Sequence, residues 1–119
     1  MDVRLKRAYE PPARSDGYRV LIDRLWPRGV SKDDAQLDQW ARELAPSSEL
    51  RRWFGHDPAR FDEFRRRYRG ELAGQEEKLR ELRRRARAGT LTLVYGARDS
   101  EHNDAVVLAD LLRRGRRAR

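Results

Sequence analysis

The segment DRLWPRG, residues 23–29, places an acid and two arginines where an apolar run ends. Asp23, Arg24 and Arg28 at the end of a strand are typical of a polar cleft. Guanidinium groups donate paired, charge-assisted hydrogen bonds to phosphate and carboxylate groups. Trp26 stands among them and could stack on a planar ligand, although packing is the commoner use of a tryptophan. The segment therefore predicts a site for an anionic, nucleotide-like small molecule, with Arg24, Trp26 and Arg28 as ligand-binding residues.

A second polar run, residues 98–104, follows the last predicted strand and includes His102. Imidazole exchanges protons near neutral pH, so His102 is a candidate general acid or base, with Asp23 or Asp99 as the carboxylate that orients it. The neighbouring candidates for ligand binding are Arg98, Ser100 and Asn103. The alternative is structural: Asp23 and Arg98 would then form a cross-strand ion pair that only fixes the loop ends.

His56 lies in WFGHDP, on a turn before a helix, and either fixes that turn by a hydrogen bond or contacts the ligand. The chain has no cysteine, which excludes disulfides, thiolate zinc sites and a cysteine nucleophile. No metal-binding triad with familiar spacing is present, and the GxGxxG, P-loop and GxSxG motifs are absent. We therefore predict no metal and no cofactor, and whether the protein is an enzyme stays open.

Hydrophobic periodicity predicts the elements that must position these residues. The predicted strands are residues 3–9, 18–26 and 90–97. The predicted helices are one that carries Leu37, Trp40 and Leu44, one from Ser47 or Ser48 to Gly55, one that starts at Asp57 and Pro58, breaks near Gly74 and closes at Gly89, and a last one capped by Asp99 or Ser100. Cap residues, prolines and glycines mark their ends.

The order of these elements predicts an α/β fold: a small mixed, mainly parallel sheet of three or slightly more strands with helices packed on it. The loop between the first two strands favours an antiparallel pair, whereas the long helical crossover to the third strand favours a parallel one. The carboxyl ends of the second and third strands would then lie side by side, where ligands bind in open α/β sheets. The last helix would add free N–H groups and a positive dipole that attract an anion.

Length and composition limit the class of protein. The chain of 119 residues carries a net charge of +8, with 38% hydrophobic and 40% charged residues. This length suits a single domain over residues 1–113, followed by a basic, flexible tail over residues 114–119. No apolar run is long enough to span a bilayer and no signal peptide is present, so we expect a cytoplasmic protein without a membrane partner. The oligomeric state stays open.

The basic charge also favours a second function, in which the protein binds nucleic acid as a regulatory accessory. Residues 65–67, residues 83–85 and the tail would then contact phosphates. Against this, acidic residues on the same helices balance much of the charge, and an arginine-rich composition can reflect codon usage. A third alternative is a protein-interaction domain whose apolar helix faces dimerise.

The motifs DRLWPRG, WFGHDP and ARDSEHNDAVVL, together with VRLKRAYEPP, make the chain similar to the YeaO-like family of small bacterial proteins, domain of unknown function 488 (DUF488). The likeness covers nearly the whole chain apart from the basic tail, and it implies a compact α/β domain without an established activity. Longer relatives carry a Cys-His-Arg segment where this chain has EHND, so thiol chemistry does not transfer. The resemblance implies a location only, formed by the motif residues Asp23, Arg24, Trp26, Pro27, Arg28, Gly29, Trp53, His56, Arg98, Asp99, His102 and Asn103.

Overall fold

The computed structural model describes residues 1–114, so the predicted tail lies, except for its first residue, outside the described part of the chain. The strands are β1 (Asp2–Arg7), β2 (Tyr18–Leu21), β3 (Gln39–Trp40) and β4 (Thr90–Tyr95). The α-helices are α1 (Lys32–Ala35), α2 (Ser48–Phe54), α3 (Phe61–Leu72), α4 (Glu76–Ala88) and α5 (Asp104–Arg114). Three short 3-10 helices are η1 (Arg14–Asp16), η2 (Arg42–Leu44) and η3 (Pro58–Arg60). None of the helices within residues 1–114 has the length and apolar content needed to cross a lipid bilayer.

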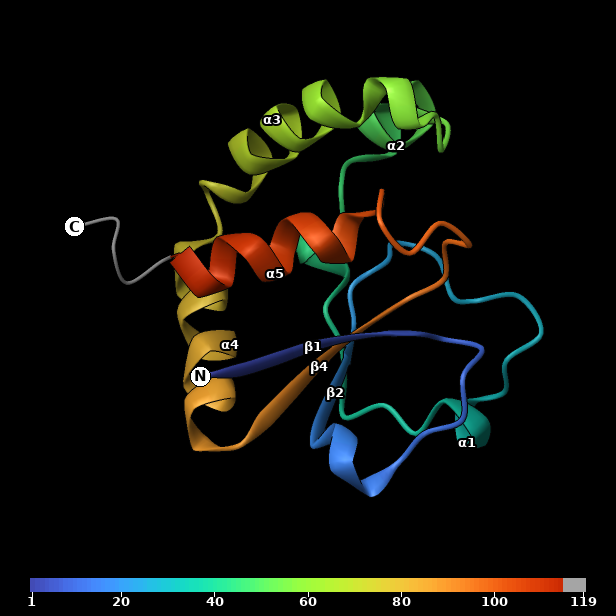
Figure 1. The fold of residues 1–119 in the computed structure, drawn as a ribbon, viewed down its shortest axis with the longest axis vertical. Helices are drawn as coiled ribbons and strands as arrows, with labels where there is room; N and C mark the ends of the chain where they lie inside the picture. The colour runs from blue at the N-terminus through green and yellow to red at the C-terminus, as the bar shows by residue number, and fades with distance from the viewer. Residues whose placement is uncertain (115–119) are drawn as a thin grey trace.

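The four strands form one sheet in the order β1-β4-β2-β3, and all neighbours run parallel. The predicted α/β class, with a mainly parallel sheet, is confirmed. The predicted antiparallel pairing of the first two strands is wrong. Strand β4 lies between β1 and β2 and pairs in parallel with both, while the loop that contains η1 brings the chain back to the edge where β1 began (Figure 1). The carboxyl ends of β2 and β4 therefore lie side by side.

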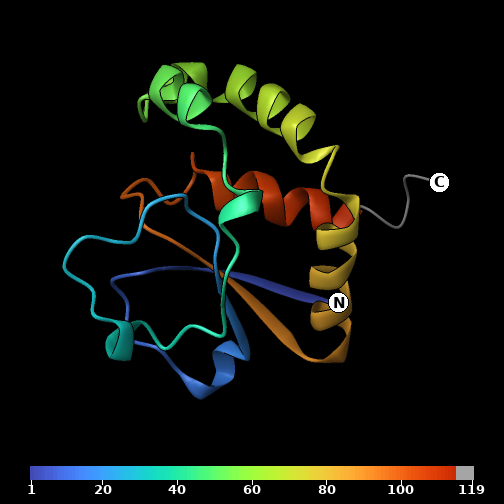
Figure 2. The same ribbon diagram turned by 180° about the vertical axis from the view of Figure 1, so that it is seen from behind.

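One face of the sheet carries the helices and the larger core. Helices α4 and α5 contact β1 and β4, and α3 packs on α5, as both ribbon views show (Figures 1 and 2). The predicted helix ends are confirmed at several positions. Ser47 caps α2 by accepting a hydrogen bond from the Leu50 N–H, and Gly55 ends it in the left-handed region. The predicted break near Gly74 separates α3 from α4.

The opposite face has a smaller apolar cluster, formed by residues of the sheet and of the segment after β2. Trp26, Leu37 and Trp40 pack there on Leu21 and Val94. The predicted helix through Leu37, Trp40 and Leu44 is wrong. Gln36 adopts a left-handed conformation (φ 45°) that ends α1, and the chain then extends so that Trp40 pairs with Leu21.

The end of β4 and the start of α5 also differ from the prediction. Asp99 accepts hydrogen bonds from the backbone N–H groups of Glu101 and His102, which forms a separate turn ahead of the helix. Helix α5 begins only at Asp104, where the Asn103 side chain accepts a hydrogen bond from the Val106 N–H. Asn103, rather than Asp99 or Ser100, therefore caps the last helix, and His102 lies before its first turn.

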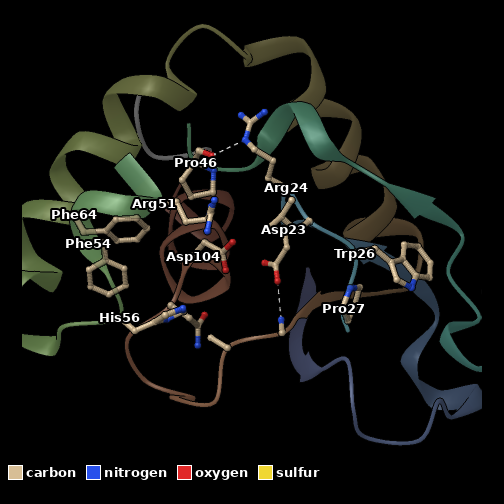
Figure 3. A pocket seen from close by; sticks show the side chains of 14 residues that line it. Asp23, Arg24, Trp26, Pro27, Pro46, Arg51, Phe54, His56, Phe64 and Asp104 are labelled. Atoms are coloured by element: carbon tan, nitrogen blue, oxygen red, sulfur yellow. Dashed lines mark hydrogen bonds between the residues drawn. The ribbon is translucent and has the colours of Figure 1, made fainter. Parts of the chain in front are cut away.

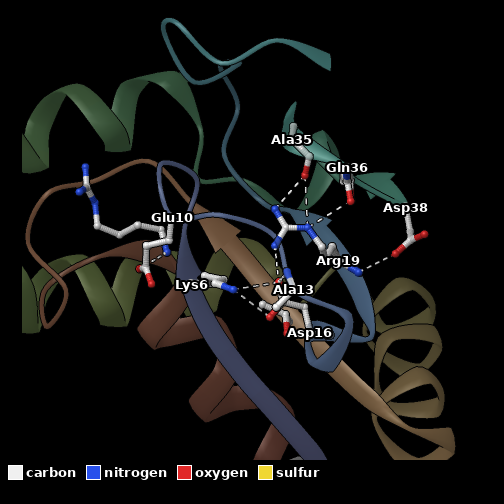
Figure 4. Close-up of polar contacts among 10 residues, drawn as sticks. Lys6, Glu10, Ala13, Asp16, Arg19, Ala35, Gln36 and Asp38 are labelled. Carbon is white, nitrogen blue, oxygen red and sulfur yellow. Dashed lines mark hydrogen bonds and ion pairs between the residues drawn. The ribbon is translucent and has the colours of Figure 1, made fainter. Parts of the chain in front are cut away.

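A buried network of charges fixes β1, β2 and α1 relative to one another (Figure 4). The Asp16 carboxylate accepts hydrogen bonds from Lys6 Nζ at 3.0 Å and from Arg19 Nη1 at 2.7 Å. Arg19 also donates to the carbonyl oxygens of Ala35 and Gln36 at 2.8 and 3.1 Å. Because these groups satisfy one another, the charges can be buried within the fold.

Candidate functional site

A pocket of about 230 Å³ opens at the carboxyl ends of β2 and β4, beside α2 and the start of α5 (Figure 3). It has an acidic pair, two arginines and an apolar wall. The residues that line it are Asp23, Arg24, Leu25, Trp26, Pro27, Pro46, Arg51, Phe54, His56, Phe64, Gly96, Ala97, Asn103 and Asp104. This is the edge of the sheet at which the sequence predicts a ligand site.

The acidic pair consists of Asp23, from the segment after β2, and Asp104, the first residue of α5 (Figure 3). Burial raises the pKa of the Asp104 carboxyl well above its ordinary value, and the nearby charge of Asp23 raises it further. Two carboxylates that line one pocket repel each other, so Asp104 keeps its proton to a higher pH than an isolated carboxyl group does.

Two hydrogen bonds hold Asp23 in place, one from the backbone directly after β4 and one from the Trp40 side chain of β3. Its Oδ2 atom accepts a hydrogen bond of 2.8 Å from the Gly96 N–H, and its carbonyl oxygen accepts one of 2.8 Å from Trp40 Nε1. A Cβ atom at Gly96 would lie 3.2 Å from Asp23 Oδ2, which is tight for a nonbonded contact. Glycine at this position therefore lets the β4 backbone approach the carboxylate.

Two guanidinium groups line the same pocket. Arg24 follows Asp23 in the chain, and its Nε donates to the Pro46 carbonyl oxygen at 3.2 Å, which fixes its direction (Figure 3). Arg51 comes from the exposed face of α2. Neither forms an ion pair with a carboxylate of residues 1–114. Both can therefore donate to an anionic ligand without breaking an internal salt bridge.

Aromatic rings form the apolar wall. Phe54 and Phe64 stack with their ring centroids 4.3 Å apart, and His56 lies 6.2 Å from Phe54. His56 has a left-handed backbone (φ 58°), a conformation that costs a residue other than glycine roughly 1–3 kcal/mol. Below the wall, the buried Tyr68 hydroxyl donates to the Leu44 carbonyl oxygen. Burial, followed by the charges of Asp104 and Asp23, raises the pKa of Tyr68 well above its usual value, so the hydroxyl stays protonated.

The structure brings half of the predicted site residues to this pocket. Those that line it are Asp23, Arg24, Trp26, His56 and Asn103. Those outside its lining are Arg28, Arg98, Asp99, Ser100 and His102. Arg28 is exposed, and its carbonyl oxygen accepts a hydrogen bond from the Tyr9 hydroxyl. The predicted ion pair between Asp23 and Arg98 is not formed within residues 1–114, because the Asp23 carboxylate accepts a hydrogen bond from the Gly96 N–H instead.

His102 and Asp99 form a pair of their own outside the pocket lining. His102 Nδ1 lies 2.8 Å from Asp99 Oδ2, and the imidazole packs edge-on against Phe61 with centroids 5.1 Å apart. The backbone N–H of Glu101, followed by the His102 side chain, lowers the pKa of the Asp99 carboxyl. These contacts stabilise the turn that precedes α5. His102 and Asp99 thus lie at the distance expected of a general base and its orienting carboxylate, but neither is among the residues that line the pocket.

The amino end of α5 is occupied by the chain itself. The Asn103 side chain accepts a hydrogen bond from the Val106 N–H. The Asp104 carboxyl group lies at this helix end, in the lining of the pocket, where the sequence predicts a bound anion. The arginines, rather than this helix end, are the groups available to an anionic ligand.

The sequence-based prediction missed four lining residues with a clear role: Asp104, Arg51, Phe54 and Phe64. Asp104 had a usable signal, since it opens the helix that follows the predicted strand end. Phe54 and Phe64 belong to two different helices, and only their packing shows that both face the pocket. No group of three or more acidic or histidine side chains suited to a metal ion occurs within the part of the chain that the structure describes.

Comparison with known proteins gives one family. A family model described as the inactive DUF488-N3 subclade matches residues 2–118. The chain is 46% identical over 113 residues to the uncharacterized protein YeaO of Escherichia coli (strain K12), which covers 95% of this chain and 98% of that protein. It is also 46% identical over 110 residues to the uncharacterized proteins Mb3100c of Mycobacterium bovis and Rv3073c of Mycobacterium tuberculosis, with 92% of each chain covered. No solved structure matches the chain significantly.

Proposed function

The chain belongs to the YeaO-like DUF488 family, and on this premise we propose that it binds a small nucleotide-like anion in its pocket without converting it chemically. One observation carries the proposal: Arg24 and Arg51 line the same pocket as an aromatic wall and a pair of acids. A nucleotide offers a partner to each of these groups, namely phosphate, a planar ring and hydroxyl or amino donors.

Each part of the pocket suits one part of such a ligand. Arg24 and Arg51 would donate charge-assisted hydrogen bonds to the phosphate. The Phe54 and His56 rings would contact the base, and Asp23 would accept hydrogen bonds from sugar hydroxyl or amino groups. The volume of about 230 Å³ is below that of pockets for drug-sized ligands. A mononucleotide whose phosphate stays at the pocket mouth is therefore favoured over a dinucleotide.

Two observations favour binding over catalysis. The subclade whose model matches the chain is described as inactive. In addition, His102 and Asp99 contact each other but are not among the residues that line the pocket. A general acid or base must reach the reacting group, directly or through one water molecule. We propose a cytoplasmic location for this binding protein, which the absence of cysteine supports.

The alternative of nucleic-acid binding has weaker support, because many of the arginines it needs already have partners. Arg66 and Arg67 both pair with Glu63. Arg84 pairs with Glu81. Arg83 is buried and donates to the carbonyl oxygens at the end of α5. Phosphate contacts through these residues would have to compete with interactions inside the protein.

Calorimetric titration at low salt tests the proposal. The probes are the four ribonucleoside 5′-monophosphates, ribose 5-phosphate and inorganic phosphate. At least one nucleotide should give saturable heat, and Arg24→Ala or Arg51→Ala should weaken its binding about tenfold or more, the effect of losing a hydrogen bond to a charged group.

Arg87→Ala is the matched control, since it removes the same charge from the exposed face of α4. It should leave the affinity unchanged. Saturable heat with none of the probes would contradict the proposal. An equal loss of affinity in the Arg87 variant would show that the interaction is only a nonspecific attraction between charges.

A further inference from the structure

We propose that Asp23 selects the base of the bound nucleotide, so that the pocket takes a guanine nucleotide in preference to the other three. This inference rests on the proposed function and names the ligand of the same site. It follows from the hydrogen-bonding groups that the pocket leaves to a ligand, and from the direction of the Asp23 carboxylate among them (Figure 3).

The polar side chains that line the pocket divide into those that the protein already uses and those that it leaves to a ligand. Asn103 belongs to the first group, because its amide nitrogen donates to the Asp99 carbonyl oxygen at 2.8 Å and its oxygen accepts from the Val106 N–H at 3.0 Å. Asp23 and Asp104 also line the pocket, and neither has an arginine or lysine partner within residues 1–114. Apart from the arginines and the imidazole, the lining side chains thus offer acceptors, and the ligand must supply donors.

The Asp23 carboxylate is held in one orientation and still has an oxygen available. Its Oδ2 atom accepts from the Gly96 N–H at 2.8 Å, and the Asp23 carbonyl oxygen accepts from Trp40 Nε1 at 2.8 Å. Within residues 1–114, no N–H group is hydrogen-bonded to Asp23 Oδ1. A carboxylate that is oriented in advance loses little freedom when a ligand binds, which favours specific recognition.

Asp23 and the arginines would contact different ends of the ligand. Asp23 and Arg24 are neighbours in the chain, yet their side chains point in different directions, and a hydrogen bond of 3.2 Å turns Arg24 towards the Pro46 carbonyl oxygen (Figure 3). The phosphate that Arg24 and Arg51 would hold is therefore set apart from the group that Asp23 contacts. In a mononucleotide, the part farthest from the phosphate is the outer edge of the base.

Guanine is the base whose outer edge suits a carboxylate. It places two donors side by side, the N1–H group and the 2-amino group, and each carboxylate oxygen has room for two hydrogen bonds. Adenine and cytosine place a ring nitrogen that accepts beside their amino group, and uracil places its N3–H between two carbonyl oxygens. An acceptor that faces a carboxylate gives up its water without gaining a partner. The Asp23 carboxylate therefore discriminates against the other three bases.

Calorimetric titration of the full chain with a series of nucleoside 5′-monophosphates tests the inference. Guanosine monophosphate (GMP) should bind about tenfold or more tightly than the adenosine, cytidine and uridine compounds. Inosine monophosphate (IMP) lacks only the 2-amino group and should bind about tenfold more weakly than GMP, the effect of losing one hydrogen bond to a charged group. Xanthosine monophosphate (XMP) has an oxygen in place of that amino group, which the carboxylate repels, so it should bind more weakly still.

Asp23→Asn tests whether this residue selects the base. The Gly96 N–H still requires an acceptor, so it holds the amide oxygen towards itself and leaves the NH₂ group in the place of Oδ1. That NH₂ group opposes the donors of guanine and can donate to the 2-oxo group of XMP. The ratio of GMP affinity to XMP affinity should therefore fall about tenfold or more in the variant. Asp33→Asn makes the same change on the exposed surface of α1 and should keep the wild-type ratio.

The outcomes separate the two proposals. Equal affinity for all four bases, or a preference for a base other than guanine, overturns the selection by Asp23 and leaves the proposed function standing. A ratio of GMP to XMP affinity that Asp23→Asn does not change has the same meaning. If no nucleotide binds, the proposed function and the selection fail together. Should Asp23→Asn not fold, as judged by circular dichroism, the comparison of GMP, IMP and XMP in the wild-type protein decides, because these three ligands differ only at position 2 of the base.

Discussion

Two aspartates, Asp16 and Asp104, lie within the fold in opposite surroundings. Asp16 is 6% exposed and accepts hydrogen bonds from Lys6, Arg19 and the Ala13 N–H (Figure 4). Burial alone would raise the pKa of its carboxyl, but these hydrogen bonds outweigh burial and lower the pKa. Asp104 faces Asp23 in a pocket wall, and burial and that second acid raise its pKa.

The contrast between the Asp16 site and the acidic pair shows what each contributes to the protein. Every partner of Asp16 belongs to the chain itself, so the site is complete and serves to join β1, β2 and α1. The acidic pair has two carboxyl groups and too few donors, and it stands beside arginines that have no internal ion pair within residues 1–114. An incomplete set of partners in a pocket is typical of a binding site, because a ligand can complete it.

The largest expected effect breaks the complete site. Arg19→Met removes the guanidinium group that contacts Asp16 and the carbonyl oxygens of Ala35 and Gln36. Breaking one side of a buried ion pair costs about 3–5 kcal/mol of unfolding free energy. Urea denaturation of the variant should show a loss of this size. A loss below about 1 kcal/mol would mean that Lys6 alone can compensate the Asp16 charge.

A smaller loss is expected next to Asp16, in the turn that positions it. Gly17 has a left-handed backbone (φ 64°), and a Cβ atom there would lie 2.3 Å from the Thr90 carbonyl oxygen. The strained conformation alone costs an alanine roughly 1–3 kcal/mol, and the contact with β4 adds to this cost. Gly17→Ala should therefore lower the thermal unfolding midpoint. Gly70→Ala, on the helix α3, meets no atom within 4 Å and is the control.

Removing a carboxyl group from the acidic pair should stabilise the protein, in contrast to the substitutions at Arg19 and Gly17. The folded-state pKa of Asp104 is raised, so its contribution to stability is complete at low pH and is lost as pH rises through that pKa. Asp104→Asn removes this loss, so the variant should be more stable than the wild-type protein at the alkaline end of the range. Stability of both proteins measured from pH 5 to pH 9 checks this. A wild-type curve as flat as that of the variant would contradict it.

At Asp16 the pH dependence has the reverse sign. Its folded-state pKa is lowered, so the stability that it contributes is complete above the ordinary aspartate range and is lost as pH falls through the lowered value. In the same denaturation series, Asp16→Asn should be less stable than the wild-type protein at neutral pH. The difference between the two proteins should shrink in acid.

The smallest effect is expected at a third acid, Glu63, which pairs with Arg66 and Arg67 on the surface of α3. These arginines lower its pKa to about 2. Exposed ion pairs contribute little to stability because water and salt screen them. Glu63→Gln should leave the urea denaturation midpoint unchanged within error. A clear shift would show that exposed charges on this protein contribute to stability as well. Burial would then not explain the contrast between the Asp16 and Asp104 sites.

Local signals predicted much of the fold. The caps at Ser47 and Gly55 and the break near Gly74 depend on short-range geometry, which the sequence displays directly. Strand β3 could not be predicted, because Leu37, Trp40 and Leu44 have helical spacing. The chain becomes extended there only because Gln36 turns left-handed and Trp40 packs over Leu21, a contact between distant segments.

At the candidate site, too, local signals predicted some residues correctly, while hydrogen bonds that only the structure shows decided the positions of others. The sequence predicts which strand ends meet, so Asp23, Arg24 and Asn103 were identified as site residues that the structure places in the pocket. It does not show which way the segment between β4 and α5 turns, since Asp99 redirects that segment through its own hydrogen bonds. His102 therefore lies outside the pocket lining, and Asp104, two residues further along, forms the acidic pair.

The position of β4 in the chain has a consequence for protein synthesis. β4 spans residues 90–95, yet it separates β1 from β2 and pairs with both, while only the two-residue pairing of β2 with β3 can form without it. The sheet therefore cannot be completed until residues 90–95 have left the ribosome, and until then β2 can pair only with the two residues of β3. Assembly of this sheet thus depends on contacts between segments far apart in the chain, which form slowly.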